Sequence, residues 1–222
     1  AADGEEARRY IVELARSRGV RSIVKSKSMA SEEIHLNAAL EEAGLDVVET
    51  DLGEYIIQLA GEMPSHIIAP AIHKTREQVS DLFERHLGMP PTSEVPPMIR
   101  AARQALRQRF LRADMGISGV NFGVADEGAV VVVENEGNAR LSTSVPRIHV
   151  AIMGIERIVE RLDDLGVMLQ VLARSATGQK LSAYTSVISG PARPGEEDGP
   201  EEIHLVLLDN GRSKILGGRY AE

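Results

Sequence analysis

Short apolar strands alternate with amphipathic helices along the first part of the chain, and this alternation limits the fold more than any other feature. Ala7, Ile11 and Leu14 recur at helical spacing, and residues 22–24 follow as a short buried strand. The same patterns predict strands at 46–49 and 66–69, and helices at 31–44 (capped by Ser31), 52–60 and 75–87. A repeated strand–helix order predicts parallel strands with helices packed on the sheet.

The later part of the chain has a different pattern of predicted elements, in which strands are separated by glycine-bearing turns. One long helix is predicted from Ile158 through Leu172, and residues 209–212 predict a hairpin turn with 213–216 returning as a strand. The predicted strands are 117–125, 129–133, 149–153, 183–188 and 202–208. We therefore predict an α/β fold, with a parallel-rich sheet flanked by helices and with added antiparallel strands.

A proline-rich stretch, 88–97, is predicted to be a linker or an exposed loop. We treat residues 1–222 as one domain, in which the linker separates two sub-lobes, 1–88 and 98–222. A helix predicted at 98–113 carries several arginines. Its basic face is either a solvated surface or a docking face for an acidic partner.

The composition excludes several classes of function. The formal charge of −8 and the 3% aromatic content argue against binding to nucleic acid or to an anionic membrane surface. No apolar run approaches the length of a transmembrane span, and no signal peptide is visible, so we expect a cytoplasmic protein. The chain has no cysteine, which excludes disulfides and thiolate-held clusters within it, and both of its ends look cut from something longer.

Polar side chains follow each predicted strand of the first part of the chain. Lys25 and Lys27 come after the strand 22–24, and Asp51 comes after the strand 46–49. Open α/β sheets bind ligands at the carboxyl ends of their strands, so these side chains predict a pocket that attracts anions. The alternative is that the lysines are surface charges beside a helix cap.

A polar knot, 134–140, follows the run of four valines at 130–133. Glu134 is a candidate base, and Arg140 offers a planar fork suited to a carboxylate or phosphate. Asn121 is predicted either beside Glu134 or out in water. The alternative is a loop whose side chains satisfy its own backbone.

No catalytic or nucleotide-binding motif is complete in the sequence. The spacing assembles no Ser/His/Asp triad, and neither common glycine-rich nucleotide loop is present. Glu32 and His35 have the spacing of a metal pair on a helix, but two ligands without a third make a weak case, and we predict no metal site.

The segments VKSKSMASEEIHLN, TDLGEYIIQLAGEMPSHIIAPAIHKTREQV, GISGVNFGVADEGAVVVVENEGNARL, LARSATGQ and LVLLDNGRS together resemble the LUD domain of the lactate utilization protein B family. The likeness covers nearly the whole chain. It implies a fold similar to the superfamily of ribose-5-phosphate isomerase, glucosamine-phosphate deaminase and CoA transferase. It also implies a full-length parent with two [4Fe–4S] clusters and partner lactate utilization subunits; no cofactor is expected within these 222 residues.

The resemblance leads to one main hypothesis and two alternatives. In the main one, the parent takes part in oxidising L-lactate to pyruvate with electron transfer, and this domain binds a small carboxylate such as lactate. The alternatives are a non-redox isomerase or CoA-transferase type of enzyme, and a docking scaffold for partner subunits. Our candidate catalytic residues are Glu134 and Asp51; our candidate substrate-binding residues are Lys25, Lys27, Glu32, Asn121, Asn138 and Arg140.

Overall fold

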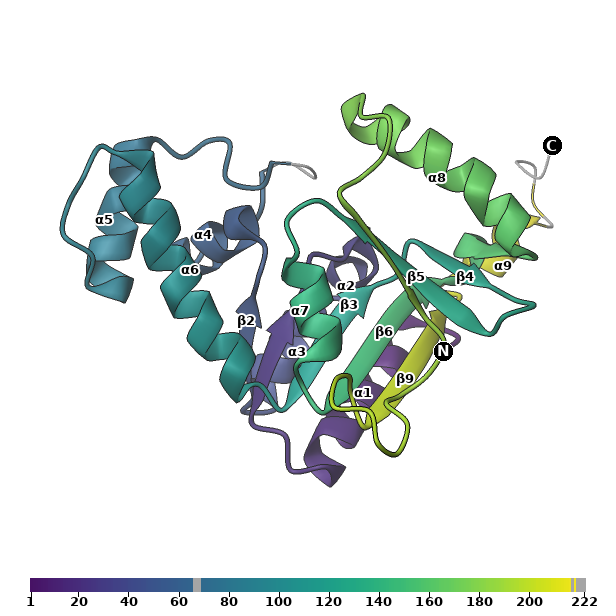
Figure 1. The fold of residues 1–222 in the computed structure, drawn as a ribbon. Helices are drawn as coiled ribbons and strands as arrows, with labels where there is room; N and C mark the ends of the chain where they lie inside the picture. The colour runs from purple at the N-terminus through teal and green to yellow at the C-terminus, as the bar shows by residue number, and fades with distance from the viewer. Residues whose placement is uncertain (66–68, 217, 219–222) are drawn as a thin grey trace.

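The computed structural model describes residues 1–65, 69–216 and 218, and it contains two β-sheets (Figure 1). One sheet is five-stranded and parallel throughout, in the order β2-β1-β3-β6-β9. The other is four-stranded and mixed, in the order β7-β4-β5-β8. The strands are β1 (Ser22–Lys25), β2 (Asp46–Glu49), β3 (Met115–Gly119), β4 (Phe122–Val124), β5 (Ala129–Glu134), β6 (Ile148–Gly154), β7 (Ile158–Val159), β8 (Tyr184–Ile188) and β9 (Glu202–Leu208).

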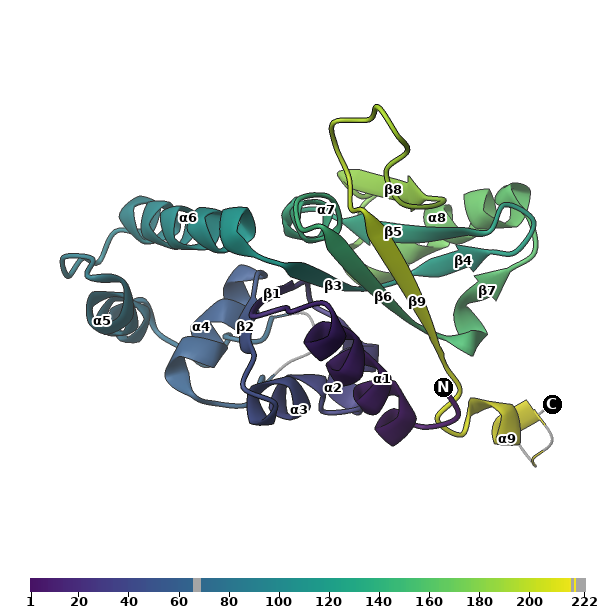
Figure 2. The same ribbon diagram turned by 90° about the horizontal axis from the view of Figure 1, so that it is seen from below.

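Helices cover both faces of the parallel sheet (Figure 2). Helices α1 and α3 lie on one face, and α7 lies on the other together with the mixed sheet. The helices are α1 (Gly4–Ser17), α2 (Met29–Glu33), α3 (Leu36–Glu42), α4 (Leu52–Ala60), α5 (Arg76–Leu87), α6 (Val95–Arg112), α7 (Asn138–Ser144), α8 (Leu162–Thr177) and α9 (Arg212–Leu216), with a 3₁₀ turn at Ile155–Arg157. The α/β prediction, with its parallel-rich sheet and added antiparallel strands, is confirmed.

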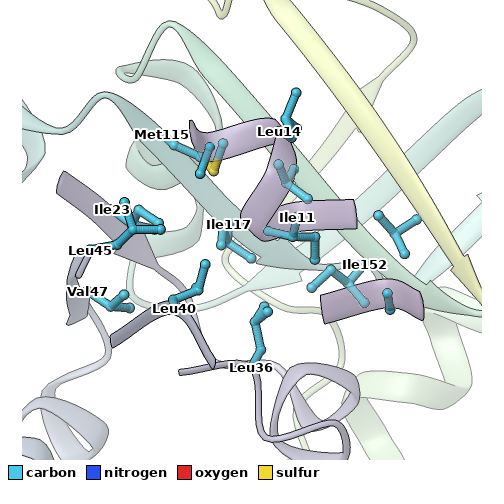
Figure 3. Packing of buried hydrophobic residues seen from close by; sticks show 14 of the residues in the cluster. Ile11, Leu14, Ile23, Leu36, Leu40, Leu45, Val47, Met115, Ile117 and Ile152 are labelled. Carbon is cyan, nitrogen blue, oxygen red and sulfur yellow. The ribbon is translucent and has the colours of Figure 1, made fainter. Parts of the chain in front are cut away.

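The main core lies between α1, α3 and the parallel sheet (Figure 3). Ile11 of α1 and Leu40 of α3 pack against Ile117 and Ile152, and all of these side chains are buried. Burying such side chains stabilises the fold by about 1.5–3 kcal/mol each relative to exposure. The apolar positions at helical spacing therefore fix which face of each helix turns toward the sheet.

On the opposite face, α7 packs very closely on β3. A Cβ added to Gly116 would lie 1.7 Å from the backbone oxygen of Ser142, a distance no side chain tolerates. Glycine at this position therefore permits the approach that brings the start of α7 to the edge of the parallel sheet.

Helices α5 and α6 form an extension at one end of the molecule (Figure 1). Phe83 of α5 packs with Met98 and Ala102 of α6. The other half of α6 returns to the sheet, where Phe110 packs in a cluster with Val24.

Several predicted boundaries are wrong. Residues 209–216 are not a hairpin, because Asp209 accepts hydrogen bonds from the backbone and hydroxyl of Ser213 and starts the short helix α9. The predicted strand 117–125 is interrupted at Val120 and Asn121, where the chain passes from one sheet to the other. Ile158 belongs to β7 rather than to the long helix, which begins at Leu162.

The N-terminal cap of the second helix also differs from the prediction. Ser28, not Ser31, caps α2, and His35 adopts a left-handed conformation that separates α2 from α3. Helix α6 begins at Val95, inside the predicted linker, with proline at its first positions, where the missing N–H is not needed. The strand predicted at 66–69 lies largely outside the described residues, and Ala69 itself is not in a strand.

Among the helices of the described chain, none combines the length and the apolar character needed to cross a membrane.

Candidate functional site

A pocket of about 560 Å³ lies where the two sheets meet, at the carboxyl ends of β1, β3 and β6. Small-molecule sites commonly have volumes of roughly 300–1,000 Å³ and occupy this edge of an α/β sheet. Its walls come from segments far apart in the sequence: Ser26–Ala30, Glu33, Asp51, Gly119–Asn121, Val132–Glu136, Asn138, Ala139, Ile152, Gly154, Glu156, Arg157, Leu172, Ala176 and Arg212. The loops that begin near Lys25, Asp51 and Glu134 therefore meet beside one pocket, as the sequence predicted.

Lys25 lies beneath this pocket rather than in its wall. Its side chain is 1% exposed, and its Nζ forms an ion pair with Glu49 Oε1 at 2.8 Å and donates to Ser31 Oγ at 3.1 Å. Asn37 Nδ2 donates to the same Glu49 oxygen at 2.6 Å. The Lys25 ammonium group is thus held by Glu49 and Ser31, and a ligand would reach it only by displacing these two partners.

Lys27 has a different environment from Lys25, although the two are only two positions apart. Its stem lines the pocket, while its buried Nζ lacks any hydrogen bond and lies 3.4 Å from Glu54 Oε1. The pKa of Glu54 is raised, first by burial and then by the nearby Glu32 carboxylate, against the opposing effect of Lys27. Burial therefore disfavours the negative charge that would otherwise satisfy the Lys27 ammonium group.

Glu32 joins the same group of charges but does not line the pocket. Burial raises the pKa of Glu32, with Lys25 opposing and Glu49 reinforcing the shift. In the described part of the chain, unpartnered buried polar atoms gather here: Lys27 Nζ, Asn37 Oδ1, Glu49 Oε2 and Glu54 Oε1. We call these five residues, together with Lys25, the β1–β2 polar cluster. Its hydrogen-bonding capacity exceeds what its own members supply.

Asp51, a candidate catalytic residue, caps α4. Its Oδ1 accepts from the backbone N–H groups of Gly53 and Glu54 at 3.0 and 3.2 Å. Asn138 lies beside it: turning the Asn138 amide lets its oxygen accept from Asp51 N and Thr50 Oγ1, each at 3.2 Å. In that orientation the Asn138 nitrogen donates to Glu134 Oε2, also at 3.2 Å, so one amide connects the β2 and β5 loops.

Glu134, the other candidate catalytic residue, caps α7. Its two carboxylate oxygens accept from the backbone N–H groups of Ala139 and Arg140 at 2.8 and 2.6 Å. The Arg140 side chain does not line the pocket; its guanidinium lies 6.0 Å from the centre of the Tyr184 ring. The polar knot thus satisfies much of its own backbone, which was the alternative interpretation of this segment.

Asn121 positions the wall of the pocket. It lies between β3 and β4, and its Oδ1 accepts from the backbone N–H of Val133 at 2.8 Å. It therefore lies beside the β5 strand that carries Glu134, one of the two placements that the sequence allowed. Of the eight candidate residues, five line the pocket: Lys27, Asp51, Asn121, Glu134 and Asn138. Lys25 lies directly under it. The roles assigned to all eight residues stay predictions.

The charged residues at the far end of the pocket were not among the candidates predicted from the sequence. Arg212 contacts Glu33 at 2.8 Å and Glu156 at 2.6 Å, and it joins α9 to α2 and to the turn after β6. A hairpin at 209–216 would have placed Arg212 elsewhere, so the wrong secondary structure hid this group. Glu54 had a signal in the sequence: it lies one helical turn after Asp51 and therefore on the same side of α4.

No group of three or more metal-ligating side chains occurs within the part of the chain that the structure describes. A buried histidine contact lies inside the parallel sheet, where Ser118 Oγ and His149 Nε2 are 2.8 Å apart and both residues are fully buried. Burial lowers the pKa of His149 to about 4. This pair lies away from the pocket walls.

The chain is an α/β domain with a pocket at the carboxyl edge of its parallel sheet, the edge at which open α/β sheets commonly bind ligands. Residues 1–208 match the LUD domain, and the chain belongs to the LUD domain family. The resemblance found in the sequence is thereby confirmed.

Curated relatives are longer than this chain. It is 50% identical over 221 residues to "Lactate utilization protein B" of Anoxybacillus flavithermus, covering 99% of this chain and 47% of the relative. The protein of the same name from Bacillus licheniformis is also 50% identical, with 46% of its length covered. A solved "duf162 family protein from deinococcus radiodurans" is 14% identical with a TM-score of 0.38, over 94% of this chain and 99% of that one. The chain thus spans less than half of the length of these curated relatives.

Proposed function

We propose that this chain is the ligand-binding domain of a cytoplasmic protein that takes part in lactate utilization. Its pocket would hold a small carboxylate, with L-lactate as the first candidate, in a multi-subunit system that oxidises L-lactate to pyruvate and passes the electrons on. The names of the relatives support the process, and the pocket supports the ligand class.

The observation that carries the ligand class is the state of Lys27. Its ammonium group has three donors and no hydrogen bond, and its nearest carboxylate is one whose pKa is raised by burial. A ligand carboxylate entering from the pocket, with a small rotation of the Lys27 side chain, would supply a stronger partner. The carboxylate of Asp51 on the adjoining wall, which uses only its Oδ1 to cap α4, would receive the hydrogen bond of a 2-hydroxyl group.

The arrangement at Glu134 favours binding over covalent catalysis. A nucleophile or a general base needs an oxygen that can approach the substrate. Both oxygens of Glu134 accept backbone N–H groups and hold the start of α7 in place. We therefore rank the isomerase or CoA-transferase alternative below carboxylate binding.

The iron–sulfur clusters expected in the parent do not fit these residues. [4Fe–4S] clusters are held by cysteine thiolates, and this chain has no cysteine. The proposal therefore assigns the clusters to the rest of the parent and gives this chain no part in holding them. Partner lactate utilization subunits are also part of the proposal, and the names of the relatives support them.

Calorimetric titration of L-lactate and of pyruvate tests the proposal. We expect saturable heats with the wild-type chain and an affinity at least about tenfold weaker in Lys27→Met, equivalent to the loss of about 1.4 kcal/mol. Arg140→Gln is the matched control, because it also removes a cation but one that lies outside the pocket walls. Equal binding by wild type and Lys27→Met would remove Lys27 from the site, and no binding by the wild type would refute the ligand class.

A further inference from the structure

The outward face of α8 carries exposed apolar side chains. Val167 is 61% exposed and Val171 is 56% exposed, whereas Leu165 on the inward face is buried against the mixed sheet. An open hollow of about 470 Å³ runs along the same face, lined by Val167, Gln170, Val171, Arg174 and Ser175. In Figure 1, α8 lies at the upper edge of the molecule.

The two valines belong to a regular stripe along the helix. Asp164, Val167, Val171 and Arg174 are spaced by three, four and three residues, which is the spacing of the contact seam of a two-helix coiled coil. The seam is apolar in the middle, acidic at its N-terminal end and basic at its C-terminal end. These charges are not used in ion pairs within the described chain: the ion pairs among its residues include neither Asp164 nor Arg174.

The stripe is complementary to an inverted copy of itself. Positions 164 and 174 are centred on residue 169, and so are positions 167 and 171. When two copies of α8 lie antiparallel across a two-fold axis at this centre, each Val167 meets Val171 of the other copy. The same register places each Asp164 against Arg174 of the other copy, so every position in the seam has a matching partner.

We propose that this chain self-associates through α8, as an antiparallel two-fold pair in which Asp164, Val167, Val171 and Arg174 form the seam. The occupant of the face is a second copy because the distribution of charge along the stripe is self-complementary under two-fold symmetry. A single helix pair buries little surface, so the dimer is weak and forms as concentration rises.

Sedimentation-velocity measurements over a range of concentrations test this association. The wild-type chain is expected to show a concentration-dependent monomer–dimer equilibrium. The double change Val167→Gln/Val171→Gln should weaken the dimer by about tenfold or more. Leu111→Gln is the matched control, since Leu111 is equally exposed, at 61%, but belongs to α6, a helix separate from α8 (Figure 1), and it should leave the equilibrium unchanged.

Two charge reversals test the register itself. Arg174→Glu places like charges together at both ends of the seam, and so does Asp164→Lys, so each variant alone should be monomeric. An equimolar mixture of the two variants should form heterodimers, because each reversed residue then faces a residue of opposite charge on the other chain. Circular dichroism checks that α8 stays folded in Asp164→Lys, since Asp164 also accepts from the N–H of Arg161. A wild-type chain that is monomeric at all concentrations, or a dimer that is unaffected by Arg174→Glu, would overturn the proposal.

Discussion

Two groups of ion pairs border the pocket, and they differ in burial. In the β1–β2 polar cluster, the side chains of Lys25 and Glu49 are 1% and 7% exposed. At the opposite end, those of Arg212 and Glu156 are 20% and 46% exposed. Water screens the second pair and offers its members an alternative partner, whereas the first pair has only its own hydrogen bonds. An ion pair between a cation and a glutamate is therefore expected to matter for stability at the buried end of the pocket and to contribute little to stability at the exposed end.

Removing one buried charge should have the largest effect. Lys25→Met leaves Glu49 buried without its cation, and we expect the free energy of unfolding to fall by about 3–5 kcal/mol. Urea denaturation measures this loss. Adding Glu49→Met should recover much of the lost stability, because the pair is then replaced by apolar side chains of similar size. A single variant as stable as wild type would show that solvent reaches this cluster.

The backbone provides a second contrast between buried and exposed positions. Gly116→Ala would push a methyl group against the backbone of α7, and we expect a loss of at least about 1–3 kcal/mol of stability. Gly166→Ala on α8 meets nothing within 4 Å, and it should raise stability by roughly 0.5–1 kcal/mol through helix propensity. Thermal unfolding of both variants gives the comparison; losses of equal size would contradict the close packing of α7 on β3.

The pH dependence of stability should also distinguish the two ends. Because the folded-state pKa of Glu54 is raised above the ordinary 4.5, the folded protein binds more protons than the unfolded chain as pH rises above about 4.5. The contribution of Glu54 is therefore present at low pH and is lost as pH rises through its folded pKa. Wild-type stability should decline over this range relative to Glu54→Gln, in parallel urea titrations. A constant difference between the two proteins would contradict the raised pKa.

The exposed pairs should give the smallest effect. Arg212→Met removes contacts to Glu33 and Glu156, and we expect a loss of about 0–1 kcal/mol at neutral pH. Arg212 lowers the pKa of Glu33, so this contribution is present above the ordinary Glu pKa and fades as pH falls through the lowered value. Unfolding measured at high salt should reduce the difference further. A loss as large as that of Lys25→Met would mean that the two ends are equivalent.

The sequence predicted the features that depend on periodicity and position after a strand. Strand 202–208 is confirmed in full. The convergence of the loops after β1 and β2 followed from the parallel pairing of these strands, whereas β5 belongs to the mixed sheet and its place beside them depends on how the two sheets pack.

The features that the sequence missed depend on contacts between distant segments. The turn at Asp209 has the same letters as a hairpin turn, but Asp209 accepts hydrogen bonds from Ser213 and Arg212 contacts the distant Glu33 and Glu156, so the chain continues as α9. Lys25 and Lys27 look alike in the sequence, but Lys25 is the last residue of β1 and pairs with Glu49 of β2, whereas Lys27 lies in the loop beyond the strand and faces Glu54 of α4. Glu134 and Asp51 look like reactive carboxylates until the helices that they cap are in place.

In the proposed function, L-lactate binds in the pocket between the two sheets. A titration of ¹⁵N-labelled chain with L-lactate, followed through backbone amide chemical shifts, tests it directly. The account predicts saturable shifts at Lys27, Gly119 and Asn138, which border the pocket on three different segments, with the amides of α5 and α6 unmoved. Saturable shifts confined to α5 and α6, or none at the three pocket amides, would contradict it.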